Sequence, residues 1–189
     1  MGPRHGIGLF KTGSSDPGSL AQQSLIRTYL QDNRAEKALE AFAEMQENGM
    51  LPDVATCHTL IVAYGRCNKA DEALEMLADM QRRGLECCVG TYNAVIRACE
   101  KSNKAEEALG MLADMQRRGL KPNAGTYRGL ICACVRDDKI EKAFDLSEEM
   151  QQRGLQPDLI MHNALISACE KRNWAEMALE LFEELLQRG

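Results

Sequence analysis

The sequence is poor in aromatic residues and proline and lacks any long apolar run. Phe, Trp and Tyr make up 5% of its 189 residues, and there are 5 prolines. Aromatic and β-branched residues favour strands, whereas the residues abundant here, among them Ala, Leu, Glu, Lys and Met, favour helices. No apolar stretch approaches the roughly 20 residues that cross a bilayer, so no membrane-spanning helix is expected. A hydrophobic content of 44% is enough for a core, and the composition predicts an all-α protein.

The eight cysteines show no C-x-x-C pair of the kind that binds zinc. Three of them, Cys99, Cys134 and Cys169, are spaced 35 residues apart, which predicts one structural column of small, buried, reduced thiols. No secretory signal precedes them, so a reducing compartment is expected. We expect no metal and no cofactor.

The sequence also lacks the usual signs of catalysis. It contains no evident pairing of nucleophile and base, no phosphate-binding glycine loop and no cluster of metal ligands. We therefore expect a protein that is not an enzyme.

What the chain does have is an internal repeat. The segments ALEMLADMQRRGL (73–85) and ALGMLADMQRRGL (108–120) differ at one position and lie 35 residues apart. This period divides the chain, without insertion or deletion, into five units: 19–53, 54–88, 89–123, 124–158 and a truncated 159–189. Residues 1–18 show no helical period and are rich in glycine, which predicts a flexible leader, only faintly similar to the end of an organelle transit peptide.

Residues at equivalent positions of the five units, here called columns, predict the second helix of each unit. Apolar positions recur at spacings of three and four and include the columns Ala38, Ala73, Ala108, Ala143, Ala178 and Met45, Met80, Met115, Met150, Leu185. A glycine column predicts the helix ends: Gly49, Gly84, Gly119, Gly154, Gly189. A further column precedes an acid by three residues and predicts N-caps: Asn33, Asn68, Asn103, Asp138, Asn173.

The first helix of each unit is indicated by segments such as TYNAVIRAC (91–99) and HNALISACE (162–170), which carry small and aliphatic residues at helical spacing. Each unit is therefore predicted to be helix, turn, helix. Because one helix pair cannot bury its apolar stripe alone, the units must stack on one another. The expected fold is an α-solenoid.

A 35-residue helical pair with TYN (91–93) near its start and EEALGMLADMQRRGLKPN (106–123) at its end resembles the pentatricopeptide repeat family, over residues 19–189. The resemblance implies a right-handed superhelix that binds single-stranded RNA in mitochondria or plastids, about one base per repeat. It also implies that the fifth and last residues of a unit read the base. Those positions are Gln23 with Asp53, His58 with Cys88, Asn93 with Asn123, Arg128 with Asp158, and Asn163.

The candidate pairs are unequal. Asn93 with Asn123 is a standard combination that in the family favours a pyrimidine, whereas Cys88 is a poor hydrogen-bonding group. Arg128 and Asp158 could pair with each other, or Arg128 could contact phosphate. Asp53, Asn123 and Asp158 could alternatively serve only as N-caps of the following helices. The second place, where the family usually keeps an apolar residue beside the base, holds Gly90 and Gly125 in the two middle units.

The charges are segregated despite a net charge of −5. The first thirteen places of the five units hold seven basic residues and two acids, so the rest of the chain holds 16 of the 23 basic and 26 of the 28 acidic residues. A positive inner wall suits phosphate. The thirteenth place forms a basic column similar to a lysine position that the family uses near the RNA backbone: Arg66, Lys101, Arg136, Lys171. The alternative is that these residues cap helix C-termini.

A second class of function stays open. The last unit exposes an apolar helix face with Leu179, Phe182 and Leu186, and solenoid ends require caps. This face predicts a protein partner or a second copy, which would suit a scaffold or a structural subunit of a ribonucleoprotein such as an organellar ribosome.

Overall fold

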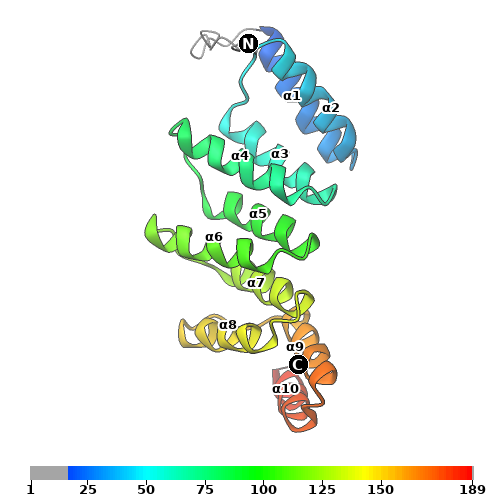
Figure 1. Ribbon diagram of the computed structural model, residues 1–189, viewed down its shortest axis with the longest axis vertical. Coiled ribbons are helices and arrows are strands. Elements are labelled where there is room, and N and C mark those ends of the chain that lie inside the picture. Colours follow the sequence, from blue (N-terminus) through cyan, green and yellow to red (C-terminus); the bar gives the residue numbers. More distant parts are fainter. Residues whose placement is uncertain (1–16, 189) are drawn as a thin grey trace, which may run out of the picture.

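The computed structural model describes residues 17–188, which form ten α-helices arranged as stacked pairs along the long axis (Figure 1). Their bounds are α1 Pro17–Gln31, α2 Ala35–Glu47, α3 Val54–Arg66, α4 Ala70–Arg82, α5 Val89–Lys101, α6 Ala105–Arg117, α7 Ala124–Arg136, α8 Ile140–Gln152, α9 Leu159–Arg172 and α10 Ala175–Arg188. The all-α prediction is confirmed. The predicted leader, residues 1–18, lies outside the described residues except for Pro17 and Gly18, which open α1, and Gly189 also lies outside them.

Within residues 17–188, each helix contacts only its own partner and helices of the adjacent pairs. The odd-numbered helices form one layer through contacts of α1 with α3, α3 with α5, α5 with α7 and α7 with α9. The helices α2, α4, α6 and α8 each pack on their own partner and on the first helix of the following pair, whereas α10 packs on α9. This arrangement confirms the predicted α-solenoid, and no helix within residues 17–188 is long and apolar enough to span a membrane.

The layer of odd-numbered helices is held together by close approach of small residues. A Cβ placed on Gly65 of α3 would lie 3.2 Å from the Cβ of Ala98 in α5. One placed on Gly129 of α7 would lie 2.7 Å from Cγ2 of Ile96, also in α5. The backbones of α3, α5 and α7 therefore pack more tightly than larger side chains would allow.

The repeated columns of the sequence form the core. Met45, Met80, Met115 and Met150 have no exposed surface, and the same holds for Ala38, Ala73, Ala108 and Ala143. The predicted thiol column is buried as well, and burial raises the pKa of Cys134 to about 11. Within the described chain, no group of His, Cys, Asp and Glu could hold a metal ion.

The glycine column ends the second helices as predicted. Gly49, Gly84, Gly119 and Gly154 have φ between 67° and 74°, the left-handed region that glycine enters without strain.

The prediction that the asparagine column forms N-caps is wrong. Asn33, Asn68, Asn103, Asp138 and Asn173 have φ between 53° and 60°, whereas an N-cap residue takes an extended backbone. The N-cap of the second helix is instead the residue that follows the asparagine or aspartate, for example Lys69 before α4 and Lys104 before α6. Neither lysine side chain makes a capping hydrogen bond. Since only two or three residues join the two helices of a unit, one must be left-handed to reverse the chain, and Asn and Asp tolerate that conformation best after glycine.

Candidate nucleic-acid interface

The predicted fifth and last positions of the third unit lie together. Asn93, on α5, donates from Nδ2 to Oδ1 of Asn123 over 3.2 Å. Thr126 donates from Oγ1 to Oδ1 of Asn93 over 2.7 Å, and its backbone N–H donates to Oδ1 of Asn123 over 3.1 Å. Asn123 is thus an N-cap of α7 and a partner of Asn93 at the same time, so both amides are held in fixed orientation.

Glycine leaves space beside this amide pair. A Cβ on Gly125 would lie 3.2 Å from Oδ1 of Asn123 and 3.4 Å from Nδ2 of Asn93. Since Gly125 itself has no side chain, that side of the two amides stays open. Each amide keeps further donor or acceptor capacity, because an Asn side chain offers two donors and two lone pairs.

Arg128 and Asp158, the predicted pair of the fourth unit, are joined by an ion pair. Nη1 of Arg128 lies 3.1 Å from Oδ2 of Asp158, and both side chains are partly exposed. The other carboxylate oxygen of Asp158 accepts from the backbone N–H of Met161 at the start of α9. The structure thus brings these residues together in a closed pair that also caps a helix.

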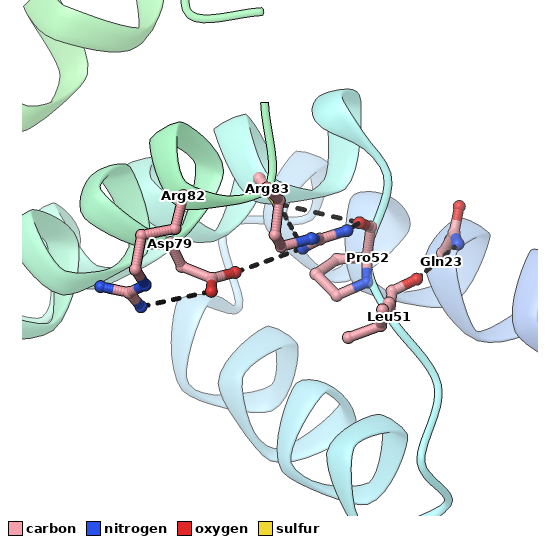
Figure 2. A network of polar contacts seen from close by, with 7 residues as sticks. Gln23, Leu51, Pro52, Asp79, Arg82 and Arg83 are labelled. Atoms are coloured by element: carbon pink, nitrogen blue, oxygen red, sulfur yellow. Dashed lines mark hydrogen bonds and ion pairs between the residues drawn. The ribbon is translucent and has the colours of Figure 1, made fainter. Parts of the chain in front are cut away.

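The first unit is different, because Gln23 is turned inward. The residue is 6% exposed, and its Nε2 faces the carbonyl oxygen of Leu51 at 3.5 Å (Figure 2). Asp53 caps α3 by accepting from the backbone N–H of Thr56, and it pairs with Arg27 at 3.7 Å. The amide of Gln23 is therefore directed at the main chain of the connecting loop.

The loop that carries Asp53 is anchored by a network at the C-terminal end of α4. Arg83 donates from Nη2 to the carbonyl oxygen of Pro52 over 2.7 Å, and Asp79 holds its Nη1 at 3.3 Å (Figure 2). Arg82 pairs with the other carboxylate oxygen of Asp79. Sequence reasoning missed this anchor, whose signal is a basic residue recurring just before the glycine column.

His58 and Cys88, the predicted pair of the second unit, both lie close to Gly90. A Cβ on Gly90 would be 3.5 Å from Sγ of Cys88 and 3.7 Å from Cε1 of His58. Cys88 is exposed and precedes α5 without capping it, with Sγ 3.5 Å from Oγ1 of Thr91. Burial and the charge of Arg97 lower the pKa of His58, which favours the neutral ring.

Cys88 should be the first thiol to react with iodoacetamide at mildly alkaline pH. Hydrogen bonds from the side chain and backbone of Thr91 lower its pKa, whereas burial raises the pKa of the other seven thiols, of Cys132, for example, to about 11. Mass spectrometry of the folded protein after limited alkylation should locate the first label on residue 88. A Cys88→Ser variant is the control and should be labelled far more slowly; equal labelling of Cys87 and Cys88 would contradict the expectation.

The basic column lies at the C-terminal ends of the odd-numbered helices. Arg66 donates to the carbonyl oxygen of Leu30 over 3.0 Å and to Oδ1 of Asn33 over 3.1 Å, so it caps the first helix of the preceding unit. Arg136 lies 3.5 Å from Glu100, while Lys101 and Lys171 are exposed. Asn163, the remaining predicted base-reading residue, is exposed on α9.

The column is part of a wider basic surface between α3, α5 and α7. Arg66, Arg97 and Lys101 line one shallow hollow between α3 and α5. Burial raises the pKa of Glu100. Four nearby positive charges act in the opposite direction but do not outweigh the burial: Arg136, Lys101, Arg128 and Arg97. One acid among these bases leaves the surface net positive.

Helix pairs that stack only on their neighbours define the class of helical-repeat solenoid proteins, to which this fold belongs. The chain belongs to the pentatricopeptide repeat family: the PPR repeat family matches residues 88–136 and 129–169, the pentatricopeptide repeat domain matches 40–102, and the PPR repeat matches 23–50 and 160–189. No curated protein sequence matches the chain.

Solved structures share this fold. The maize pentatricopeptide repeat protein PPR10 in complex with an 18-nt psaJ RNA element superposes with a TM-score of 0.78 at 20% identity, over 92% of this chain and 26% of that chain. The PPR domain of Arabidopsis thaliana protein-only RNase P 1 in complex with tRNA gives 0.74 at 16% identity, over 90% of this chain and 89% of that one. The chain thus spans about a quarter of the length of the maize protein chain.

Proposed function

We propose that this chain binds single-stranded RNA along its layer of odd-numbered helices. The observation that carries the proposal is the pair Asn93 and Asn123, whose amides are held by Thr126 beside the open space at Gly125. Membership of the pentatricopeptide repeat family supports it. So do the solved complexes of the maize protein with an RNA element and of the Arabidopsis domain with tRNA.

The units contribute unequally to base recognition. Asn93 and Asn123 present oriented donors and acceptors and select a pyrimidine, as the family pattern implies. Arg128 reaches RNA only after leaving Asp158, and in doing so it exchanges one ion pair for another with phosphate. Gln23 is buried against Leu51, and Cys88 is a weak hydrogen-bonding group, so the first two units discriminate little.

The basic column supplies affinity that does not depend on sequence. Lys101 and Lys171 are exposed and free to approach phosphate, and Arg66 and Arg136 keep part of their guanidinium groups for a second partner. Bound in this way, RNA is kept unpaired or a site on it is covered. We place this role in the RNA metabolism of mitochondria or plastids, on the family resemblance alone.

Selection from a random single-stranded RNA pool tests the proposal. The bound pool should be enriched for a short motif with a pyrimidine at one place. An Asn93→Ala variant should keep most of its affinity and lose this preference, because only one unit's base contact is removed. The matched control is Asn163→Ala, an exposed Asn at the same place in the last unit, which should retain the pyrimidine. Absence of RNA binding by the wild-type chain at low salt would refute the proposal.

A further inference from the structure

Among residues 17–188, the even-numbered helix of each of the first four units is covered by the following unit, and that of the last unit is not. At equivalent places, Ala105 and Ala108 of α6 have no exposed surface, whereas Ala175 of α10 is exposed and Ala178 is partly exposed. Phe182 shows the same contrast, since it is 49% exposed where its equivalents are covered. Those equivalents are 2–8% exposed: Phe42, Leu77, Leu112, Ser147. We call the surface formed by Ile166, Ala175, Ala178, Leu179 and Phe182 the trailing face.

The first helix shows the converse. Leu25 of α1 is 41% exposed, while residues at the same place in the next four units are at most 1% exposed: Leu60, Val95, Leu130, Leu165. Ala21, three places into the unit, is exposed, and its equivalents are buried: Thr56, Thr91, Thr126, Met161. Thr28 is exposed where four alanines are buried: Ala63, Ala98, Ala133, Ala168. We call the surface formed by Ala21, Leu25 and Thr28 the leading face.

These two faces are the halves of an interface that the described chain already makes four times. Within the solenoid, the surface equivalent to the leading face always lies on the surface equivalent to the trailing face of the preceding unit. We propose that a second copy of this chain stacks its leading face on the trailing face, so that the solenoid continues across two molecules. The repeat itself is the argument for this occupant, since it shows what covers such a face.

Charge supports the same register. In the interior of the solenoid, Lys104 forms an ion pair with Asp71 at 2.5 Å, and Lys139 forms one with Glu106. In both pairs the lysine is the sixteenth residue of its unit, and the acid is the eighteenth residue of the preceding unit. The corresponding residues at the ends are Arg34, on the leading side, and Glu176, on the trailing side. They have opposite charges, so stacking of a second copy extends this ladder of ion pairs instead of placing like charges together.

Such contacts are heterologous, because each copy uses a different face. A dimer formed in this way still has one free leading face and one free trailing face, so longer arrays should form as the protein concentration rises. This inference does not depend on RNA binding.

Sedimentation velocity of the 189-residue chain without RNA, over a wide concentration range, tests the proposal. The wild type should progress from monomer to dimer and higher species. Leu25→Arg, which blocks the leading face, and Phe182→Arg, which blocks the trailing face, should each weaken self-association by more than about tenfold, because a buried unpaired charge is costly. Val54→Arg, an exposed apolar position of α3 away from both ends, is the control and should assemble like the wild type.

Mixing the two blocked variants gives the decisive result. Leu25→Arg keeps its trailing face and Phe182→Arg keeps its leading face, so an equimolar mixture should form a dimer and stop there. Circular dichroism should first show that both variants keep the wild-type helix content, as expected for exposed positions. A monomeric wild type at all concentrations, undiminished dimerisation of Leu25→Arg alone, or failure of the mixture to dimerise would each overturn the proposal.

Discussion

Replacing Arg66, Lys101, Arg136 and Lys171 together by alanine should remove most of the salt dependence of RNA binding. Each phosphate contact contributes about 0.7 to the slope of log affinity against log salt for a single strand. Four contacts therefore account for a slope of about 3 and for a loss of roughly 50-fold over a fourfold rise in salt. The variant should bind every RNA sequence more weakly at low salt, and its salt slope should be smaller by about 3.

The matched control removes four basic residues that lie in the even-numbered helices or directly after one of them: Arg82, Arg117, Lys142 and Arg153. The net charge changes by the same amount, so a general electrostatic effect would appear in both variants. We expect the control to keep nearly the wild-type slope. The thermal stability of both variants should be measured as well, because Arg66 also caps α1 and its loss can destabilise the fold. An equal loss of slope in the two variants would show that the column has no special role.

Gly129→Leu should destabilise the solenoid by about 2 kcal/mol, as overpacking costs typically 1–3 kcal/mol or more and outweighs the roughly 1 kcal/mol gained in helix propensity. Ile96 of α5, whose Cγ2 would meet the new Cβ at 2.7 Å, is fully buried. The side chain therefore forces the two helices apart. Urea denaturation followed by circular dichroism measures the change.

Gly110→Ala is the control for this substitution. Gly110 lies within α6, and a Cβ there would have nothing within 4 Å. The alanine should stabilise the protein by about 0.5–1 kcal/mol, because it restricts the unfolded chain and meets no neighbour. This position is also the one difference between the two near-identical segments of the sequence, where the other segment has Glu75. Destabilisation by both substitutions would contradict the explanation from packing.

The repeated columns allowed the fold to be predicted in detail. An alanine or methionine recurring every 35 residues has one environment in every unit, so its burial follows from the period. The asparagine column was misassigned because its spacing to an acid satisfies a capping box and its residue type equally suits a left-handed turn. The short connection between the two helices of a unit is what requires the left-handed turn. The periodicity of the sequence does not give the length of that connection to the residue.

The candidate site was less predictable than the fold. The family pattern indicates which positions of a unit face the RNA. It does not indicate which neighbouring groups in the protein compete with RNA for the hydrogen bonds of those side chains. Arg128 is paired with Asp158, and Gln23 is turned to the main chain because a backbone carbonyl lies within its reach. The role of Thr126 in orienting Asn93 is visible only in three dimensions, although a threonine recurs at the third place of three units.

The arrangement of contacts has a consequence for how the chain folds. Among the described residues, helices meet only within a pair or between adjacent pairs, so hydrogen bonds such as that of Arg66 to Leu30 span 36 residues or fewer. Little loop entropy must be lost before a contact forms, and low contact order of this kind goes with fast folding. Any two adjacent pairs can act as a nucleus, and order then spreads toward both ends one layer at a time.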